Sequence, residues 1–463
     1  MLAEQVLKSI WEYGGAALPD TTHLRFSADQ TSLPSTYQVG ALASAAIAAQ
    51  ALAAQQIWQQ RGGAAQHIHI DNRHALAMCR SERYLQITGE APADLWSPIA
   101  GYYQAGDGRW IQLHTNFPHH RDGVLRILDC DNERAAVAAA IRNWSAAELE
   151  SCLAEQAMCA AMIRTPAEWQ AHPQAQAVAA LPLFEIRKIG EAPVRPFLPF
   201  RDQRPLDGVK VLDLSRVIAA PVAGRTLAQH GAEVLAVSAA HLPNILPLVM
   251  DTGRGKRSAQ IDLRSSVGNA QMHALMADAD VFLQAYRPGA LAGFGFAPEA
   301  LCEQYPGLIC VSLSAYGHAG PWAQRRGFDS LVQSASGIAF EEGMAAGLSS
   351  PGKLPCQALD HATGYLMAMA TMMALQRRAQ EGGSWEVRVS LAQTGHFLQS
   401  LGRRALHEQS AELAPQEIAA FRQTTESGFG RMEAIAPVET MSLTPPYFAQ
   451  AAVAPGTHAA SWS

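Results

Sequence analysis

Short apolar runs alternate with longer helical patterns from residue 208 onward. Runs rich in Val, Leu and Ile are typical of buried strands, and they lie at 209–214, 233–237, 258–263, 280–284 and 308–313. Patterns of helical period separate them at 219–230 and 267–277. Strands that alternate with helices at this spacing predict an α/β fold with a parallel, doubly wound sheet of Rossmann-like type.

A polar loop, Gln357-Ala-Leu-Asp-His-Ala-Thr-Gly364, precedes the apolar helical stretch Tyr365–Leu375, and a last strand is expected at 385–390. Asp360 is the only carboxylate of this loop. An Asp at the start of a helix commonly accepts a hydrogen bond from a free backbone N–H, so helix capping is one interpretation. The other is a functional carboxylate that the helix N-terminus holds ionised.

The plan of helix, Gly-Gly pair and strand occurs twice. Val39 to Asp71, with Gly62-Gly63, follows the same plan as Leu359 to Ser390, with Gly382-Gly383. Aligning the two Gly-Gly pairs places Gly40 opposite Asp360. Because the first copy keeps the helix without a carboxylate, the repeat favours a functional role for Asp360.

The segments before and after this region differ in character. A strand pair at 101–114 turns at 106–108 and precedes a helix that Ser145 is expected to cap, whereas the prolines at 196–205 cannot continue a helix or a central strand. We therefore divide the chain into a partial helix–strand repeat (1–94), a small α+β domain (95–182), a Pro-rich linker (183–207), a large domain with Asp360 (208–404) and a partly mobile C-terminal extension (405–463).

Composition excludes several classes of protein. The 463 residues are 48% hydrophobic and 16% charged, which indicates a globular chain of two or three domains, and the net charge of −6 gives no general attraction for nucleic acid or membrane lipid. The seven cysteines show no C-x-x-C spacing, which favours reduced thiols in the cytoplasm. His67 and His69 share a strand face near His74, but no carboxylate or Cys stands at a matching spacing, so we expect no metal.

Three loops of the large domain have the character of ligand-binding segments. The loop 213–221 leaves a strand and enters a helix N-terminus, where anions bind, but it lacks the G-x-G-x-x-G of dinucleotide sites. The basic loop 251–258 is not a Walker A motif, and it is interpreted either as solvated surface or as a phosphate contact. The loop 286–290 again follows a strand.

These motifs together resemble the family III CoA-transferases, the group of formyl-CoA transferase and carnitine CoA-transferase. The resemblance covers about 208–404 and rests, in order, on GVKVLDLSRVIAAP, GAEV, GRGKRSAQIDL, ADVFLQAYRPG, SAYGHAGP, GFDSLVQSASG and ALDHATG. Residues 95–205 resemble the smaller domain of that family, which in its ordinary members follows the large domain. The reversed order here, with the repeat, indicates a tandem duplication that lost parts of both copies.

The resemblance implies a nucleophilic role for Asp360 in moving coenzyme A between acyl-CoA and carboxylic acids, through aspartyl-anhydride and aspartyl-CoA intermediates. CoA and acyl-CoA are then substrates, and no cofactor is permanently bound. The positions that match the family's CoA site are Arg216, Val217, Ile218, Ala219, Ile261, Arg264, Tyr286 and Arg287.

The sequence departs from the family at two contacts. Ser238-Ala239 stands where the family has a Glu-Arg pair, and Gly293 stands where it has an arginine. Arg254, Lys256 or Arg287 are the cations expected to compensate. The family's Gly-rich loop has only Ser427-Gly-Phe-Gly430 as a candidate.

Two other functions remain as alternatives. One is a non-catalytic CoA-binding or scaffold protein, which the missing contacts favour. The other is a 2-methylacyl-CoA racemase, which is disfavoured because Phe328 stands where such relatives carry a proton-transferring histidine. The resemblance also implies an interlocked homodimer, although the rearranged order leaves a monomer open.

Overall fold

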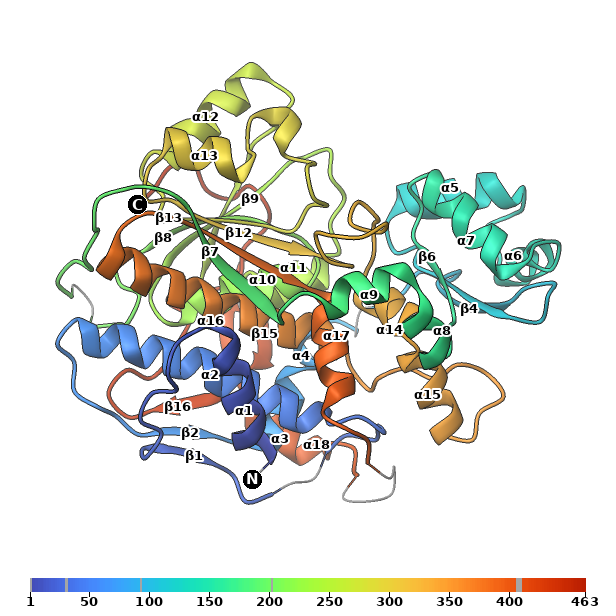
Figure 1. Ribbon diagram of the computed structural model, residues 1–463, viewed down its shortest axis with the longest axis horizontal. Helices are drawn as coiled ribbons and strands as arrows, with labels where there is room; N and C mark the ends of the chain where they lie inside the picture. Colours follow the sequence, from blue (N-terminus) through green and yellow to red (C-terminus); the bar gives the residue numbers. More distant parts are fainter. Residues whose placement is uncertain (1, 30–31, 92–93, 201–202, 405–409) are drawn as a thin grey trace.

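A mixed seven-stranded sheet and one long helix, α16 (Ala358–Glu381), form the centre of the computed structural model, which describes residues 2–29, 32–91, 94–200, 203–404 and 410–463 (Figure 1). The strand order is β10-β9-β8-β11-β12-β13-β7. Neighbours are parallel from β10 to β13, and β7 alone is antiparallel. The strands are β7 (Phe184–Gly190), β8 (Lys210–Leu214), β9 (Glu233–Ser238), β10 (Lys256–Gln260), β11 (Val281–Gln284), β12 (Ile309–Ser314) and β13 (Ser384–Ser390).

The expected α/β alternation is confirmed, because each apolar run of the large domain forms a strand of this sheet. Most of their Val, Leu and Ile side chains are buried, as residues of parallel sheets covered by helices are. The other strands lie within one residue of their expected bounds, whereas β10 begins at Lys256 rather than Ser258 and ends at Gln260 rather than Leu263. The Lys256 ammonium is buried in an ion pair with Asp213, 2.7 Å away, which lets a charged residue open this edge strand.

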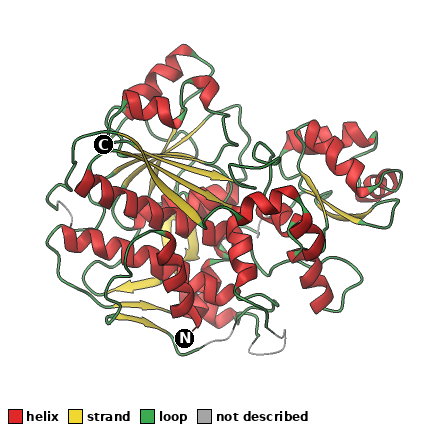
Figure 2. Ribbon diagram, viewed as in Figure 1, coloured by secondary structure: helices red, strands yellow, loops and turns green. Residues whose placement is uncertain are grey.

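Helices cover both faces of the sheet (Figures 1 and 2). On one side lie α12 (Ser266–Met276) and α13 (Pro298–Gln304), and on the other lie α10 (Ala219–Gln229) and α16. Almost every residue from Ala358 to Leu375 is buried, so α16 is an interior helix. Gly364 allows α10 to approach closely, because a Cβ built there would lie 2.5 Å from the Ala219 carbonyl oxygen.

The two helices of the sequence repeat lie against each other. The helix α2 (Val39–Gln60) packs on the far side of α16 from the sheet, and the Gln376 side-chain amide donates to the Ala53 carbonyl at 3.1 Å. The strand that follows α2, β2 (Ile68–Ile70), joins β1 (Leu24–Phe26) and β16 (Glu439–Met441) in a separate small sheet. Both copies therefore keep the order of helix and strand, but their strands belong to different sheets.

The segment expected to be the small domain forms its own antiparallel sheet with its own core. The strands are β4 (Gly101–Gln104), β5 (Trp110–Leu113) and β6 (Ala160–Met162), and the helices are α5 (Pro118–Leu128), α6 (Arg134–Ile141), α7 (Ala146–Glu155), α8 (Pro166–Ala171) and α9 (Pro173–Ala179). Ser145 caps α7 as expected, by accepting from the Glu148 N–H. A hydrogen bond of 2.6 Å from the Ser334 hydroxyl to the Gln112 amide oxygen ties this sheet to α14 (Asp329–Ala335).

Two segments differ from their expected form. Within the linker expected over 183–207, β7 pairs with β13 and carries an ion pair between Arg187 and Glu386. The prolines that indicate a linker, at 196–205, follow this strand. The C-terminal extension, of which 405–409 lie outside the described residues, contains a helix and a hairpin, α18 (Pro415–Phe421), β14 (Arg422–Ser427) and β15 (Gly430–Ile435).

The remaining elements complete the chain around this frame. They are α1 (Leu2–Tyr13), α3 (Asn72–Met78), α4 (Ser81–Tyr84), β3 (Gln86–Ile87), α11 (Leu246–Thr252), η1 (Ala292–Phe294), α15 (Ile338–Ala345) and α17 (Leu391–Ser400). None of the helices in the described ranges is both long enough and apolar enough to cross a bilayer.

We predict that Gly364→Ala destabilises the fold. A helical Gly-to-Ala change ordinarily stabilises by about 1 kcal/mol, but overpacking against the Ala219 backbone and Val222 costs about 1–3 kcal/mol, which outweighs it. Gly293→Ala is the matched control, because nothing lies within 4 Å of its added Cβ. Urea unfolding of both variants measures the difference. Equal midpoints would contradict the close approach of α10 and α16.

Candidate active site

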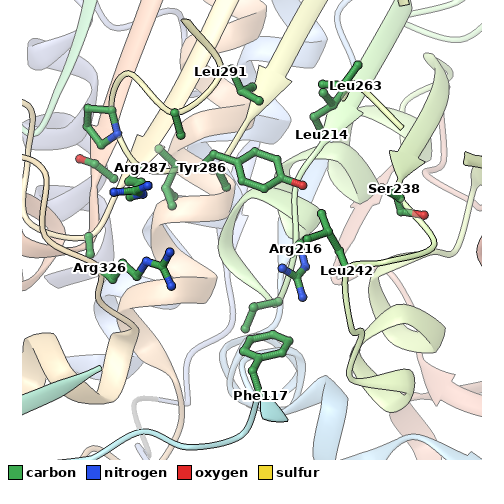
Figure 3. Close-up of a pocket in the computed structure, with 18 of the residues that line it drawn as sticks. Phe117, Leu214, Arg216, Ser238, Leu242, Leu263, Tyr286, Arg287, Leu291 and Arg326 are labelled. Carbon is green, nitrogen blue, oxygen red and sulfur yellow. The ribbon is translucent and has the colours of Figure 1, made fainter. Parts of the chain in front are cut away.

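A cavity of about 470 Å³ opens at the carboxyl ends of the parallel strands. Loops that follow β8, β9, β10, β11 and β12 line it, and the small domain contributes Phe117, His119 and His120. Figure 3 shows Phe117 across the cavity from the strand ends. This edge of a parallel sheet, where the strand order reverses between β8 and β11, is the usual place for a ligand. Six of the eight residues expected to contact CoA line the cavity: Arg216, Val217, Ile261, Arg264, Tyr286 and Arg287.

The other two expected contacts, Ile218 and Ala219, do not line the cavity. They begin α10, and they are only 5% and 3% exposed. The chain turns into this helix through Val217, whose φ of 73° is rare for a β-branched residue. Strain of this kind concentrates at ligand sites, and here it directs the loop after β8 along the cavity wall.

Arginines dominate the charge of the cavity. Arg216, Arg264, Arg287, Arg325 and Arg326 line it, while Asp262 is the single carboxylate of the lining and is already paired with Arg264 at 2.7 Å. Figure 3 shows Arg216, Arg287 and Arg326 pointing into the same space as Tyr286. Such a surplus of positive charge suits a ligand with several negative groups, such as phosphates.

The basic loop 251–258 does not supply the compensating cations. Arg254 and Lys256 are buried, and their charges are bound by Asp251 and Asp213, each at 2.7 Å. A buried cation cannot leave its carboxylate for a ligand without leaving an unpaired charge behind. The expectation that either one replaces the missing contacts is therefore wrong, and of the three proposed residues only Arg287 reaches the cavity.

Sequence reasoning missed the contributions of Phe117, Arg325 and Arg326. His119 and His120, which also line the cavity, lie in the first turn of α5. Arg325 and Arg326 follow the glycine-rich segment 315–322, and no periodic pattern or motif indicates that they belong to a binding site. Only tertiary contacts identify these residues, because the small domain and the loop after β12 meet at this cavity.

Asp360 lies in the first turn of α16 and is only 7% exposed. It does not cap the helix. The residue that does so is Asp329, whose Oδ2 atom accepts a hydrogen bond of 2.9 Å from the Asp360 N–H. Among the described residues none donates a hydrogen bond to the Asp360 carboxylate. The capping interpretation of Asp360 is therefore wrong, and its carboxylate is left without a structural task.

Burial governs the protonation of this acidic pair. Burial raises the pKa of Asp360 well above its ordinary value, and the neighbouring carboxylates Asp329 and Glu82 raise it further. Burial also raises the pKa of Asp329 to about 6, although hydrogen bonds from the Asp360 N–H and Gln333 lower it. Burial therefore opposes the ionised form of Asp360 that the helix N-terminus is expected to favour.

A buried histidine completes the surroundings of the pair. His361 Nε2 lies 3.1 Å from Glu82 Oε2, while its Nδ1 atom has no partner in the described parts of the chain. Phe328, which lines the cavity, directly precedes Asp329 and stacks on His114 with 3.7 Å between ring centroids. The cavity therefore reaches the residue next to the acidic pair, although Asp360 is not part of its lining.

The candidates from the other motifs fall elsewhere. Ser427–Gly430 forms the tip of the β14–β15 hairpin and packs against Ala452 and Val453. Within the described ranges, no group of three or more His, Cys, Asp and Glu side chains is arranged to hold a metal.

Comparison with known proteins identifies the family of the large domain. Residues 206–424 match the sequence model of CoA-transferase family III. An acyl-CoA transferase of Gibberella moniliformis is 32% identical over 64% of this chain and 56% of its own length. The (R)-2-hydroxy-4-methylpentanoate CoA-transferase of Clostridioides difficile is 31% identical over 42% of this chain and 52% of its own. The resemblance stated from the motifs is confirmed.

Solved structures give similar matches over similar lengths. A protein of Mycobacterium tuberculosis described as hypothetical is 36% identical, with a TM-score of 0.39, over 42% of this chain and 58% of that one. A CAIB/BAIF family protein of Brucella suis is 27% identical, with a TM-score of 0.38, over 49% of this chain and 65% of that one. The chain thus spans little more than half the length of the first curated relatives it matches.

We predict that Asp360→Asn stabilises the protein at neutral pH. A carboxyl whose folded pKa is raised contributes stability that is present below its unfolded pKa, near 3.9, and is lost as the pH rises through its folded pKa. The variant should therefore exceed the parent at pH 7.5, by about 1.4 kcal/mol for each unit of difference between the two pKa values. Near pH 4 the advantage should disappear.

Urea unfolding at pH 4 and pH 7.5 measures the effect. Asp131→Asn, which changes an exposed carboxylate, is the control and should shift neither midpoint. A variant that is no more stable than the parent at pH 7.5 would show that Asp360 is not held in a desolvated site.

Proposed function

We propose that this chain, whose residues 206–424 belong to CoA-transferase family III, transfers coenzyme A between acyl-CoA thioesters and carboxylic acids with Asp360 as the nucleophile. The observation that carries the proposal is a buried carboxylate free of any structural hydrogen bond, beside a cavity lined by arginines. The strand order supports a Rossmann-like, doubly wound description of the sheet around it.

The reaction divides one exchange into four substitutions. The ionised Asp360 oxygen attacks the thioester carbonyl carbon, the C–S bond breaks, and CoA leaves as a thiolate from a mixed anhydride. The thiolate then attacks the aspartyl carbonyl carbon and releases the first acid as a carboxylate, which leaves an aspartyl-CoA thioester. The acceptor carboxylate then attacks the aspartyl carbonyl carbon and displaces the CoA thiolate, which forms a second mixed anhydride. Finally the thiolate attacks the acceptor's carbonyl carbon in this anhydride, which gives the new acyl-CoA and releases the Asp360 carboxylate.

The surroundings of Asp360 favour this role once the carboxyl is ionised. A desolvated carboxylate with a raised pKa is a stronger base than one in water, so its oxygen is a better nucleophile. The neighbouring Asp329 fixes the first turn of α16 by accepting a hydrogen bond from the Asp360 N–H. Phe328 carries no proton, which supports transfer over racemisation.

A non-catalytic CoA-binding protein is the second candidate. Ser238 and Ala239 line the cavity where the family carries a charged pair, and Asp360 lies just outside the lining. The adduct experiment below separates the two functions. For either function, the free state of all seven cysteines supports a location in the reducing cytoplasm. The assembly is proposed to be a homodimer.

We predict a covalent adduct on Asp360. Incubation with an acyl-CoA followed by hydroxylamine should convert Asp360 to a hydroxamate, which peptide mass spectrometry detects. Asp360→Asn should lose the adduct and at least about a thousandfold of the transfer rate, because the nucleophile is gone. Asp131→Asn should keep both. The absence of an adduct with a broad panel of acyl-CoA thioesters would contradict the transferase and leave the binding protein.

We also predict that Arg326 contributes to CoA affinity. A charge-assisted hydrogen bond is worth about 1.5–3 kcal/mol, so Arg326→Gln should raise KM for acyl-CoA at least about tenfold and leave kcat nearly unchanged. Arg121→Gln is the control, because this arginine is paired with Asp122 outside the cavity. Steady-state kinetics at two salt concentrations measures the change. An unaltered KM would show that CoA does not occupy this cavity.

A further inference from the structure

A second cavity, of about 510 Å³, lies between the small sheet and the N-terminal ends of α14 and α16. We call it the aromatic pocket. Its lining contains three aromatic and three cationic side chains along with small and polar residues: Trp96, Tyr102, Trp110, Arg83, Arg134, Lys353, Ala100, Gly101, Gln112, Ser330, Gln333, Ser350, Leu354 and Gln357.

The aromatic walls come from the small domain. Tyr102 belongs to β4, Trp110 belongs to β5, and Trp96 precedes the sheet. The Tyr102 hydroxyl donates to the Gly352 carbonyl at 2.7 Å, which fixes its ring against the loop that leads to α16. Three large rings at one cavity present flat apolar surfaces to a ligand.

The aromatic pocket adjoins the acidic pair on the side away from the first cavity. Gly327 and Phe328 line the first cavity just before Asp329, whereas Ser330 and Gln333 line the aromatic pocket just after it. Gln333 links the pocket to the pair directly, because its amide donates to Asp329 and its Oε1 atom accepts from the Leu354 N–H at 2.9 Å. Gln357, the residue before α16, lines the pocket three positions ahead of Asp360.

The charges of the pocket point to an anion. No carboxylate is part of its lining. Arg134 and Arg83 are bound to backbone carbonyls, the first to Ala100 at 3.0 Å and the second to Pro355 at 2.9 Å, and Arg83 also forms an ion pair of 3.7 Å with Glu82, outside the lining. Lys353 stands at the exposed rim of the pocket and has neither a hydrogen bond nor an ion pair with any described residue. Partial desolvation together with Arg83 lowers its pKa. A cation in this position gains stability from a bound carboxylate.

We propose that the aromatic pocket binds the carboxylic acid that exchanges CoA, and that this acid carries a flat apolar body of aryl size. The inference rests on the proposed transfer of CoA. An apolar space of about 150 Å³ holds benzene, so the pocket exceeds the needs of a two- or three-carbon acid. Lys353 would attract the carboxylate, the rings would hold the body, and the acid group would meet Asp360 at the Gln357 end.

The first experiment measures binding without CoA. Calorimetric titration of the whole protein should show 3-phenylpropanoate binding at least tenfold more tightly than propanoate. Trp110→Leu should reduce this ratio at least threefold. Lys353→Gln should weaken both acids three- to tenfold and leave their ratio unchanged, and Lys8→Gln, which alters an exposed lysine on α1, should change neither. Equal affinities for the two acids would overturn the proposal. If Trp110→Leu does not fold, Lys353→Gln remains as the test, and unchanged affinities in that variant would also overturn the proposal.

The second experiment separates this inference from the proposed function. Transfer from one acyl-CoA to a series of acceptors should give a kcat/KM at least tenfold higher for aryl acids than for short acids, again dependent on Trp110. An Asp360 adduct combined with equal use of both classes would overturn the aryl preference and leave the transferase intact. Aryl-acid binding without any adduct would support the ligand class of the pocket and overturn CoA transfer.

Discussion

Burial of α16 along most of its length is the constraint on which the site depends. The helix lies between the sheet and α2, and its first turn enters the interior with Asp360 on it. A carboxylate on an exposed helix would keep an ordinary pKa and a shell of water. Here the packing that stabilises the domain also removes that water, so the same contacts that build the core set the reactivity of Asp360.

The division of labour between two aspartates follows from this burial. A buried helix N-terminus needs an acceptor, and Asp329 provides it from the start of α14. With the cap supplied from outside the helix, Asp360 need not fold back on its own backbone, and its oxygens stay available for chemistry. Two desolvated carboxyls side by side disfavour the folded state at neutral pH. A site that carries this destabilisation is built for a reactive group rather than for stability.

The sequence was sufficient for the features that depend on local pattern. The strands, α16, the position of Asp360 and most of the cavity loops follow from periodicity and from the rule that ligands meet the carboxyl ends of parallel strands. The features that failed depend on partners distant in the chain. Arg254 and Lys256 were expected to be available for CoA, because the sequence does not show that folding pairs them with Asp251 and Asp213. Likewise β7 needed the exposed edge of β13 before it could form a strand.

The position of the small domain in the chain matters less than its contacts with α14. The Gln112–Ser334 hydrogen bond and the bond from the Arg164 N–H to the Ser334 carbonyl place β5 and the end of β6 over the helix that Asp329 begins. These contacts bring Phe117 to one side of the acidic pair and Trp110 to the other. Because they are side-chain and edge contacts, they form equally well whether the domain precedes or follows the sheet. Within this chain they place the first cavity before Asp329 and the aromatic pocket after it, so that both adjoin the acidic pair.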